Sequence, residues 1–574
     1  MSMGTPKTGR FAIIEQLLAD NITHMFGNPG TVEQGFLDSL DDYPSFKYIL
    51  TLQETIAVAV ADGYARSTKR PTVVQLHSGV GLGNGIGMIY QAKRGNAPLV
   101  IINGESGVRY DAMDAQMAAD LVSMARPVTK WATRVVDPSS LLRVLRRAIK
   151  MAATPPMGPV FVCLPMDVLD APVEEEVVPT SFPATRTVPT PELVARAAAL
   201  LAGAQRPLFI IGDGIAASGA QAELTRVAEL TGAEVWGTNS SEVNMSQAHP
   251  QYRDDLGHMF GEHSKAITSQ ADAVLICGTY VFPEVFPALS GVFAPGAKVV
   301  HIELDAYEIA KNFPVDLGLV SDPKMTLAAL ADALEAILTA NQRQAARVRA
   351  ERLAQLKQEE RAAIQEGDRQ QHDAMPLRPS RFMTELAAQL PKDAIIFDEG
   401  LTSSPSITHA MTPTQLGHYF QTRGGSLGVG VPGAIGLKVA NPDKIVVGFS
   451  GDGGSMYTIQ ALWTAAHHKI GAKFVICNNH SYELLKLNVQ QYWKERGLPE
   501  TEFPTSFGLA DPDIRFDQLA QAMGVPAVRV EKAEQIAPAV RQMLATDGPF
   551  LIDLVISSEV PGHLEHLVHR SVGQ

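Results

Sequence analysis

Short apolar segments of strand length recur along the whole chain, and helix-length amphipathic segments separate them. They are PTVVQLH (71–77), PLVIING (98–104), GPVFVCLP (158–165), RPLFIIGDG (206–214), AVLICG (273–278), KVVHIELD (298–305), AIIFDEG (394–400), KIVVGFSGDG (444–453), AKFVICNNH (472–480) and PFLIDLVI (549–556). Strands that are apolar at every position are typical of parallel sheets covered by helices on both faces. The chain is therefore predicted to be an α/β protein built from doubly wound parallel sheets.

Two changes in composition indicate where domains meet. Prolines and acids interrupt the pattern around 174–192, and the segment 340–380 is charged and rich in Ala and Gln, as an exposed helix running into an irregular connection would be. At roughly 150 residues per domain, 574 residues suggest three or four domains. We expect three sheet domains at 1–180, 190–340 and 377–560, a linker at 341–376 and a tail at 561–574. The first and third domains share a similar rhythm of strands and helices.

Composition excludes several classes of partner. Asp and Glu (61) outnumber Lys and Arg (48), which argues against nucleic acid as the main partner, and no apolar run approaches the roughly 20 residues of a membrane span. The N-terminal residues lack the apolar stretch of a secretory signal. Cys163, Cys277 and Cys477 each lie in an apolar strand-like run, which favours reduced core thiols in a cytoplasmic protein, without disulfides or a zinc site.

The sharpest motif is Gly451-Asp452-Gly453-Gly454, which follows one apolar strand, with Asn479 after the next. We expect Ser455 to cap a helix running to about His468, so that Asp452 and Asn479 leave neighbouring parallel strands at the same sheet edge. A carboxylate and an amide oxygen there suit Mg²⁺, and the N–H groups of Gly453, Gly454 and Ser455 suit a diphosphate. A turn with an Asx cap is the plainer alternative.

This motif and its spacing resemble the cofactor motif of thiamine-diphosphate-dependent enzymes. The segments FGNPGT (26–31), LQETIAVAVADGYAR (52–66), LHSGVGLGN (76–84), GVPGAIGLKVA (430–440) and IQALWTAA (459–466) are similar to those of the 2-oxo acid decarboxylases of the benzoylformate decarboxylase group, related to pyruvate decarboxylase and acetolactate synthase. The resemblance covers nearly the whole chain. It implies pyrimidine-binding, central and diphosphate-binding domains, and a tetramer of dimers with active sites between subunits. It also implies thiamine diphosphate and Mg²⁺ as cofactors, with 2-oxo acids and aldehydes as substrates and products.

The resemblance also implies roles for individual residues. Glu54 would contact N1′ of the aminopyrimidine and promote the tautomer that forms the reactive ylid, although a glutamate in a first helical turn is also favoured by the helix dipole alone. His77 and Thr31 would face the substrate. Because Glu54 and Asp452 lie in different domains, the family arrangement would join Glu54 of one chain to Asp452 of another.

Further positions follow from the same resemblance. Ser481 would give a backbone oxygen as the third protein ligand of Mg²⁺, and Leu427 would hold the cofactor bent. The remaining cofactor contacts would come from Gly425, Gly451, Gly453, Gly454, Ser455, Tyr457 and Tyr482.

The sequence departs from the family in its substrate pocket. Val285 falls where the benzoylformate enzymes carry a second active-site histidine, which would slow or reroute proton transfer and shift the balance toward carboligation or another substrate. Leu485 and Asn488 fall where those enzymes line an aryl pocket with Leu and Phe. Asn488 weakens the case for a phenyl-bearing substrate, since an unpaired buried amide costs about 1–3 kcal/mol.

Other interpretations stay open. Gly212-Asp213-Gly214-Ile215-Ala216-Ala217 matches a weak dinucleotide pattern, but Asp213 would place a carboxylate where a pyrophosphate should bind, so we expect the central domain to be empty of FAD, ADP or coenzyme A. An acetolactate synthase-like enzyme, a 2-hydroxyacyl-CoA lyase or oxalyl-CoA decarboxylase-like enzyme, and a non-enzymatic scaffold are alternatives. His563, His566 and His569 are interpreted as part of a solvated tail helix.

Overall fold

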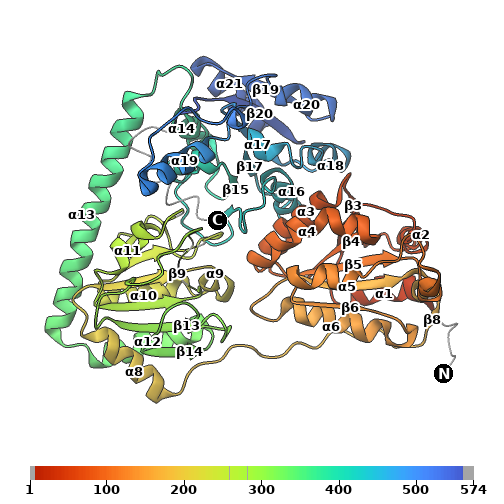
Figure 1. The fold of residues 1–574 in the computed structure, drawn as a ribbon, viewed down its shortest axis with the longest axis horizontal. Helices are drawn as coiled ribbons and strands as arrows, with labels where there is room; N and C mark the ends of the chain where they lie inside the picture. Colours follow the sequence, from red (N-terminus) through yellow and green to blue (C-terminus); the bar gives the residue numbers. More distant parts are fainter. Residues whose placement is uncertain (1–6, 239, 258, 281, 283, 560–574) are drawn as a thin grey trace.

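The computed structural model describes residues 7–238, 240–257, 259–280, 282 and 284–559 and contains three parallel six-stranded sheets flanked by helices (Figure 1). The predicted fold class is confirmed, and every apolar segment quoted above contains a strand. The tail at 561–574, with His563, His566 and His569, lies outside the described residues. No helix in the described part of the chain is long and apolar enough to cross a membrane.

The N-terminal sheet has the order β3-β2-β4-β5-β7-β6, and all its pairings are parallel. Its strands are β2 (His24–Gly27), β3 (Lys47–Leu50), β4 (Thr72–His77), β5 (Leu99–Glu105), β6 (Trp131–Arg134) and β7 (Val160–Pro165). Its helices are α1 (Gly9–Ala19), α2 (Gln34–Asp38), α3 (Glu54–Thr68), α4 (Ser78–Arg94), α5 (Leu121–Ala125), α6 (Leu141–Ala153) and α7 (Met166–Asp170). A short antiparallel pair, β1 (Lys7–Thr8) with β8 (Pro172–Val173), closes this unit.

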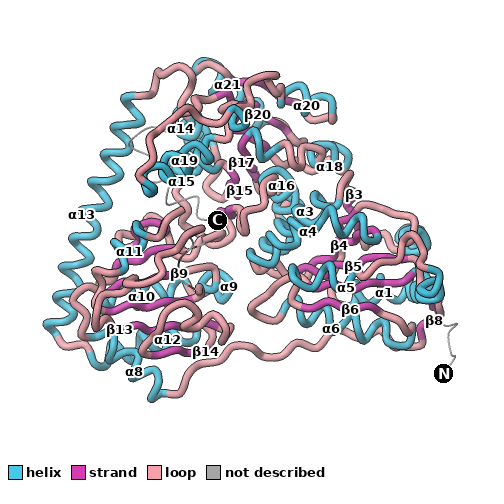
Figure 2. Tube along the Cα trace, viewed as in Figure 1, coloured by secondary structure: helices cyan, strands magenta, loops and turns pink. Residues whose placement is uncertain are grey.

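The central sheet has a different order, β11-β10-β9-β12-β13-β14. Its strands are β9 (Pro207–Ile211), β10 (Glu234–Gly237), β11 (Tyr252–Asp255), β12 (Ala273–Cys277), β13 (Lys298–Glu303) and β14 (Leu317–Val320). Its helices are α8 (Pro191–Ala202), α9 (Gly214–Ser218), α10 (Gln221–Thr231), α11 (Glu262–Thr268) and α12 (Pro323–Ile337). An extended connection without regular structure precedes α8 (Figure 2).

The C-terminal sheet has the order β16-β15-β17-β18-β20-β19. Its strands are β15 (Ile395–Glu399), β16 (Tyr419–Gln421), β17 (Val446–Gly451), β18 (Lys473–Asn478), β19 (Ala527–Val530) and β20 (Phe550–Val555). Its helices are α14 (Pro379–Gln389), α15 (Ser404–Ala410), α16 (Gly430–Ala440), α17 (Asp452–Ser455), α18 (Ala461–His467), α19 (Glu483–Arg496), α20 (Phe516–Ala522) and α21 (Ala533–Ala545). The charged segment between the central and C-terminal sheets is one long helix, α13 (Ala340–Gln370), which runs along the side of the molecule (Figure 1).

The N-terminal and C-terminal units share a hydrophobic core. Helices α3 and α16 pack with their backbones in close contact, because a Cβ at Gly63 would collide with the carbonyl of Gly433 and one at Gly436 with the carbonyl of Val60. Buried side chains from both units, among them Phe26, Ile56, Phe397 and Val431, form one cluster. This packing fixes the relative position of the two sheets within the chain. The three cysteines are buried in β7, β12 and β18, as predicted.

Candidate active site

The Gly-Asp-Gly-Gly motif lies at the carboxyl edge of the C-terminal sheet. Gly451 ends β17 and pairs with Cys477 of the adjacent parallel strand β18, so Asp452 and Asn479 leave neighbouring strand tips. The backbone N–H of Ser481 donates to Asp452 Oδ2 at 3.2 Å and to Asn479 Oδ1 at 3.0 Å. The carboxylate and the amide oxygen therefore converge on one point.

Asp452 is almost fully buried, and this burial raises the pKa of its carboxyl to about 6, although the N–H groups of Gly453 and Ser481 act in the opposite direction. A buried carboxylate is costly unless a cation or hydrogen bonds compensate it. Among the described residues there is no cluster of three or more His, Cys, Asp or Glu side chains suited to a metal. A site here would therefore consist of one carboxylate with neutral amide and carbonyl oxygens, a donor set that hard cations accept.

The helix after this motif differs from the predicted one. Helix α17 starts at Asp452 with Gly451 as its N-cap and ends at Ser455, and turns separate it from α18. Ser455 is therefore not a cap: its hydroxyl donates back to the carbonyl of Gly451 at 2.6 Å. The break has a physical reason, because the Thr458 hydroxyl in the intervening turns donates to the carbonyl of Gly428 at 2.6 Å and ties this segment to another loop.

That second loop carries Gly425 and Leu427. Gly424, Gly425 and Gly428 have φ between +76° and +88°, which non-glycine residues rarely adopt, and a Cβ at Gly428 would lie 2.7 Å from Tyr457 Cβ. The loop is thus in contact with the segment after α17. Tyr482 lies against Gly453 so closely that any side chain at Gly453 would collide with its ring. Gly425, Leu427, Tyr457, Gly453 and Tyr482 therefore border one region of the sheet edge.

Glu399 is a buried acid in this region that the sequence analysis did not single out. It accepts the N–H groups of Gly428 (2.6 Å), Val429 (3.2 Å) and Gly430 (2.7 Å) and the hydroxyl of Ser450 (3.0 Å). Burial raises its pKa to about 7 despite these bonds. Glu399 thus joins the glycine loop to β17. The glutamate just before Gly400 in AIIFDEG was the available signal, but its neighbours along the chain do not reveal these partners.

A second group of candidate residues lies at the carboxyl edge of the N-terminal sheet. His77 ends β4, and its Nδ1 lies 3.1 Å from Glu33 Oε2. Gly30, which precedes the exposed Thr31, packs directly on the imidazole, because a Cβ there would overlap the ring. The backbone N–H of Gly104 donates to Glu33 Oε1 at 3.1 Å. The loop after β2 therefore brings Thr31 and Glu33 to His77.

Glu33 is also absent from the residues singled out by the sequence. Burial raises its pKa to about 7, and the neighbouring His77 works against that shift. A carboxyl that changes charge near neutral pH beside an imidazole can hold or pass on a proton. No local motif indicates this pair, since Glu33 and His77 lie 44 residues apart and meet only through strand order.

Glu54 begins α3, as predicted, and its side chain is buried. Asn84 Nδ2 donates to Glu54 Oε2 at 3.0 Å, and a Cβ at Gly81 would come within 2.9 Å of Oε1. The glycine run at the start of α4 thus gives the carboxyl room. Within the described part of the chain, no hydrogen bond or ion pair joins Glu54 or His77 to Asp452, Asn479 or Ser481.

Three further residues predicted for the substrate pocket, besides Thr31 and His77, differ in exposure. Val285 on the central unit is 53% exposed, and Leu485 on α19 is 42% exposed. Asn488, one turn further along α19, is partly buried, and its side-chain oxygen is buried without a hydrogen-bond partner among the described residues. After β18, the single chain therefore leaves one exposed apolar side chain, Leu485, and one unsatisfied amide, Asn488.

The segment Gly212–Ala217, which runs from the end of β9 into α9, packs closely against other parts of the chain at its two glycines. Cβ atoms at Gly212 and Gly214 would lie 2.7 Å from Thr279 Cβ and 2.5 Å from Gly278 Cα. Asp213 accepts the N–H and hydroxyl of Ser241 and pairs with Arg423 Nη1 at 2.8 Å. Burial would raise its pKa, but Arg423 and Ser241 outweigh burial and hold the pKa below its ordinary value. The glycines serve close packing, and Asp213 links the central unit to the C-terminal one.

Comparison with known proteins identifies the family. Three family models match in chain order: the thiamine pyrophosphate enzyme N-terminal TPP binding domain (residues 7–124), central domain (194–330) and C-terminal TPP binding domain (402–554). The chain is 31% identical over 553 residues to benzoylformate decarboxylase of Pseudomonas aeruginosa, covering 96% of this chain and 98% of that protein. The chain thus belongs to the family of thiamine-pyrophosphate-dependent enzymes.

Other relatives carry two different activities in their names. A probable acetolactate synthase large subunit of Methanococcus aeolicus is 28% identical over 571 residues, covering 96% of this chain and 92% of that protein. Among solved structures, the thiamine diphosphate-dependent 4-hydroxybenzoylformate decarboxylase of Rhodococcus jostii matches with a TM-score of 0.82 and 26% identity, covering 96% and 99% of the two chains. This protein is therefore an enzyme of the decarboxylase and acetolactate synthase branch.

Proposed function

We propose that the protein is a thiamine-diphosphate- and Mg²⁺-dependent decarboxylase of 2-oxo acids that also joins the resulting acyl unit to an aldehyde. The observation that supports this best is the combination of a relative of matching length, the Pseudomonas benzoylformate decarboxylase, with two sheet edges carrying the expected chemistry. One edge offers oxygen ligands and a glycine turn, and the other offers an acid–imidazole pair.

The C-terminal edge fits the diphosphate and the metal. Asp452, Asn479 and the carbonyl of Ser481 would bind Mg²⁺, since the two side-chain oxygens already converge on the Ser481 N–H. Gly451, Gly453, Gly454 and Ser455 would face the diphosphate, where any side chain at Gly453 would collide with Tyr482. Gly425, Leu427, Tyr457 and Tyr482 would border the organic part of the cofactor.

The N-terminal edge would supply proton transfer. Thiamine diphosphate, when bound, supplies the electron sink that allows the carboxyl carbon to leave. Glu54 would hold a proton against a ring nitrogen of the cofactor, with Asn84 fixing the orientation of its carboxylate. His77 would bind the substrate carboxylate and exchange protons with the reacting carbon, while Glu33 fixes the tautomer of His77 through Nδ1. Thr31 would add a hydroxyl donor.

The substrate pocket differs from one built for a phenyl ring. Val285 offers no proton where the resembled enzymes carry a histidine, so proton return to the product would depend more on His77. The unsatisfied oxygen of Asn488 would need a donor from the substrate, which favours a polar or short side chain over an aryl group. Leu485 would supply the adjacent apolar contact.

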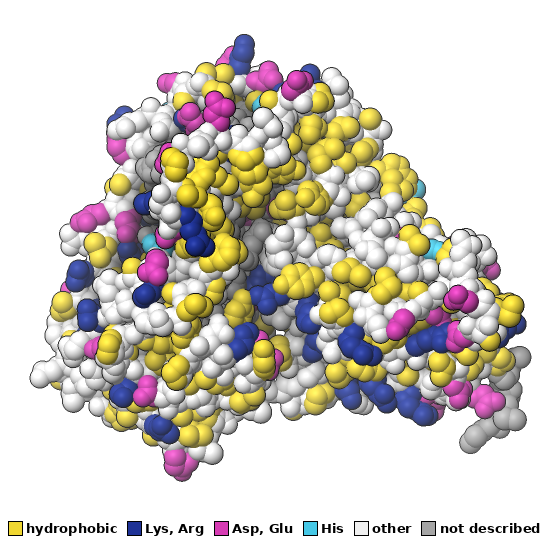
Figure 3. All heavy atoms as spheres, in the orientation of Figure 1, with side chains coloured by type: hydrophobic (Ala, Val, Ile, Leu, Met, Phe, Trp, Pro, Cys, Tyr) yellow, Lys and Arg dark blue, Asp and Glu magenta, His cyan; other side chains and the backbone are white. Residues whose placement is uncertain are grey.

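We further propose that the working unit is a homodimer, and that two dimers form a tetramer. Exposed apolar side chains border both sheet edges: Val80 (66%), Tyr457 (59%), Leu52 (47%) and Met456 (42%). On the face drawn in Figure 3, hydrophobic side chains gather over the C-terminal unit and along its border with the N-terminal unit. A second chain covering them would bring its Glu54 to the Asp452 of the first.

Mixing two inactive variants tests this arrangement. The E54Q and D452A variants, each expressed alone, should have little activity. Co-expression of the two should restore activity, because a hybrid dimer holds one site with both native residues. Failure of the hybrids to regain activity, with dimers confirmed by sedimentation, would contradict a site shared between chains.

Activity itself is tested with purified protein, thiamine diphosphate, Mg²⁺ and a panel of aliphatic and aryl 2-oxo acids, measuring CO₂, aldehyde and ligation product. We expect CO₂ release to require both cofactors and to disappear with EDTA. Absence of CO₂ release from every 2-oxo acid would contradict the proposal.

An acetolactate synthase-like transferase is the second candidate, favoured by the similarity to acetolactate synthase subunits over 96% of the chain. A 2-hydroxyacyl-CoA lyase or oxalyl-CoA decarboxylase-like activity would share the cofactor edge. These alternatives would be favoured if the purified protein showed the absorbance of bound FAD, or if its central unit bound an adenine nucleotide. The close packing at Gly212 and Gly214 argues against nucleotide binding in the segment Gly212–Ala217, and therefore for the decarboxylase.

A further inference from the structure

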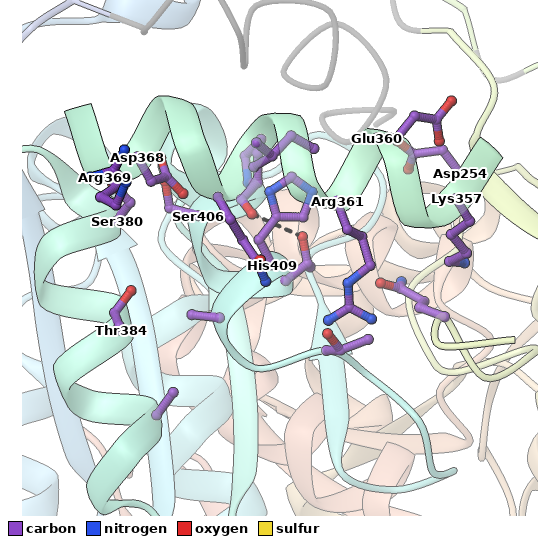
Figure 4. Close-up of a pocket in the computed structure, with 18 of the residues that line it drawn as sticks. Asp254, Lys357, Glu360, Arg361, Asp368, Arg369, Ser380, Thr384, Ser406 and His409 are labelled. Carbon is purple, nitrogen blue, oxygen red and sulfur yellow. Dashed lines mark hydrogen bonds between the residues drawn. The ribbon is translucent and has the colours of Figure 1, made fainter. Parts of the chain in front are cut away.

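A cavity of about 730 Å³ lies between β11, α13, α14 and α15 (Figure 4). None of its lining residues belongs to the proposed active site. Its volume falls within the roughly 300–1,000 Å³ typical of small-molecule sites. The central unit, the long helix and the C-terminal unit all contribute to its walls.

The wall formed by α13 is unusual for a helix packed between two units. Lys357, Arg361, Ile364 and Asp368 all line the cavity, and their spacing places them on one face of the helix. His372 also lines the cavity, two residues beyond the end of α13. A helix in this position ordinarily turns an apolar stripe inward. The buried residues of α13, Ala346 and Leu353, both precede this stretch. The second half of α13 thus holds polar side chains over the cavity.

Cationic side chains outnumber acidic ones in the lining, although the whole chain carries a formal net charge of −13. The cations are Arg253, Lys357, Arg361, Arg369 and Arg381, and the acids are Asp254, Glu360 and Asp368. Arg253 pairs with Glu360 at 2.5 Å, yet its Nη1 is buried without a hydrogen-bond partner among the described residues. The same holds for Nε of Arg381. Buried guanidinium donors without acceptors are costly, and an anion would satisfy them.

Three of these cations lie close enough to repel one another. Burial, helped by the positive charges of Arg253 and Arg361, lowers the pKa of the Lys357 amine to about 8, although Asp254 and Glu360 act in the opposite direction. The Lys357 amine already donates to the carbonyls of His249 and Tyr252, which holds it in place. An anionic group at this end of the cavity would relieve the repulsion.

Cationic side chains lie at both ends of the cavity, and at one end Arg369 is already paired with Glu366, which a bound anion would have to displace. In Figure 4, Arg361 and Lys357 are at one end, Arg369 is at the other, and Ser406 and His409 lie between them. Eight residues of α-helix separate Arg361 from Arg369, a rise of about 12 Å. We propose that this cavity binds an elongated metabolite with a phosphate at each end, of the sugar bisphosphate class. Arginines would bind the phosphates, and the Ser406 hydroxyl would lie beside the sugar.

Calorimetric titration of the holoenzyme, saturated with thiamine diphosphate and Mg²⁺, tests the proposal. The probes are fructose 1,6-bisphosphate, inorganic phosphate and fructose. We expect one bisphosphate per chain, bound at least tenfold more tightly than inorganic phosphate, and no binding of fructose. R361A and R369A should each weaken bisphosphate binding by about tenfold or more, since each removes charge-assisted bonds to one phosphate. R361K, which keeps the charge but loses the paired donors, should fall between wild type and R361A.

The matched control is R352A, which removes an exposed arginine from the same helix outside the cavity. It should leave the affinity unchanged. Arg361 is exposed, so R361A is expected to fold, which a thermal unfolding curve checks. The proposal is overturned if the bisphosphate binds no more tightly than fructose or inorganic phosphate. It is equally overturned if R352A weakens binding as much as R361A, because the effect would then come from overall surface charge.

Discussion

The N-terminal and C-terminal sheets have the same strand order but different chemistry at their carboxyl edges. Numbered within each unit, their strands run 2-1-3-4-6-5, whereas those of the central sheet run 3-2-1-4-5-6. In open α/β sheets, ligands bind where the strand order reverses, which here lies between the first and third strands. Those strands are β2 and β4 in one unit and β15 and β17 in the other. His77 ends β4 and Asp452 follows β17, so each proposed half of the active site has a residue beside this point, while Asn479 follows the next strand, β18.

At each of these points lies a buried glutamate that ends or follows the first strand of its unit. Glu33 follows β2 and contacts His77 at the tip of β4, and Glu399 ends β15 and contacts Ser450 near the tip of β17. Burial raises both pKa values to about 7. Glu33 faces an imidazole that can exchange a proton, while the partners of Glu399 are backbone N–H groups and one hydroxyl. The shared topology sets the location, and the partner decides between proton transfer and scaffolding.

The largest effect on turnover is expected at Glu54, in the N-terminal unit, which is proposed to supply proton transfer. E54Q keeps the size of the side chain and an acceptor for Asn84, but cannot carry the proton, so turnover should fall about a thousandfold. Affinity for thiamine diphosphate, measured by calorimetry in the same variant, should change little. An unimpaired rate would contradict the role proposed for Glu54.

The opposite result is expected at the carboxyl edge of the C-terminal sheet, where a substitution should weaken cofactor binding itself. D452A removes the buried carboxylate, so the Kd of thiamine diphosphate with Mg²⁺ should rise at least about a hundredfold, equivalent to about 2.7 kcal/mol. D443A is the matched control, because Asp443 is an exposed acid in the turn before the same strand, at its other end. Tight cofactor binding by D452A would break the division between the two edges.

Much of this fold could be predicted from the sequence because its central strands are apolar at every position. Most strands that were not singled out, such as β6 and β16, are short edge strands, and β6 is only partly buried. The exceptions, β2 and β10, are interior strands of only four residues each. An edge strand is covered less completely, so its sequence pattern is weaker. The apolar pattern therefore predicts the interior of each sheet better than its margins.

The candidate site was predictable where its residues follow strands directly. His77, Glu54 and Asp452 each stand at the boundary of an element that the sequence predicts. Glu33 and Glu399 could not be found in this way, because their partners come from distant segments and are brought together only by strand order. The predicted helix from Ser455 to His468 is wrong for a similar reason, since Thr458 bonds to Gly428 on a separate loop.

A smaller effect is expected at Glu33. E33Q keeps an acceptor for His77 but removes the titrating carboxyl, so kcat should fall about tenfold, and the limb of its pH profile near 7 should flatten. The pKa of the Glu33 carboxyl is raised in the folded protein, so between about pH 4.5 and 7 the folded protein keeps this proton while the unfolded chain loses it. The free energy of unfolding of the wild type should therefore fall as pH rises through this range. The difference should approach about 3 kcal/mol.

Urea unfolding of wild type and E33Q at pH 5 and pH 7.5 measures this difference, because other buried acids contribute equally to both proteins. The free energy of unfolding should depend less on pH in E33Q. Identical pH dependence in the two proteins would mean that Glu33 does not titrate as its burial indicates.

The smallest effect on catalysis is expected at Glu399, and it sharpens the comparison most. E399Q places an amide NH₂ where backbone N–H groups already donate, so the loop carrying Gly425 and Leu427 should loosen from β17 and cofactor affinity should fall about three- to tenfold. The kcat of the fully loaded enzyme should change little, and no limb of its pH profile should move, because Glu399 touches no reacting group.

E303Q is the matched control: Glu303 in the central sheet is also mostly buried with its pKa raised to about 7, and it also accepts a backbone N–H, from Leu304 at 2.7 Å. If E399Q and E303Q reduce cofactor affinity equally, the loss comes from general destabilisation. If E399Q alters the pH profile as E33Q does, the two glutamates share a role in proton transfer, and the distinction between the two edges is wrong.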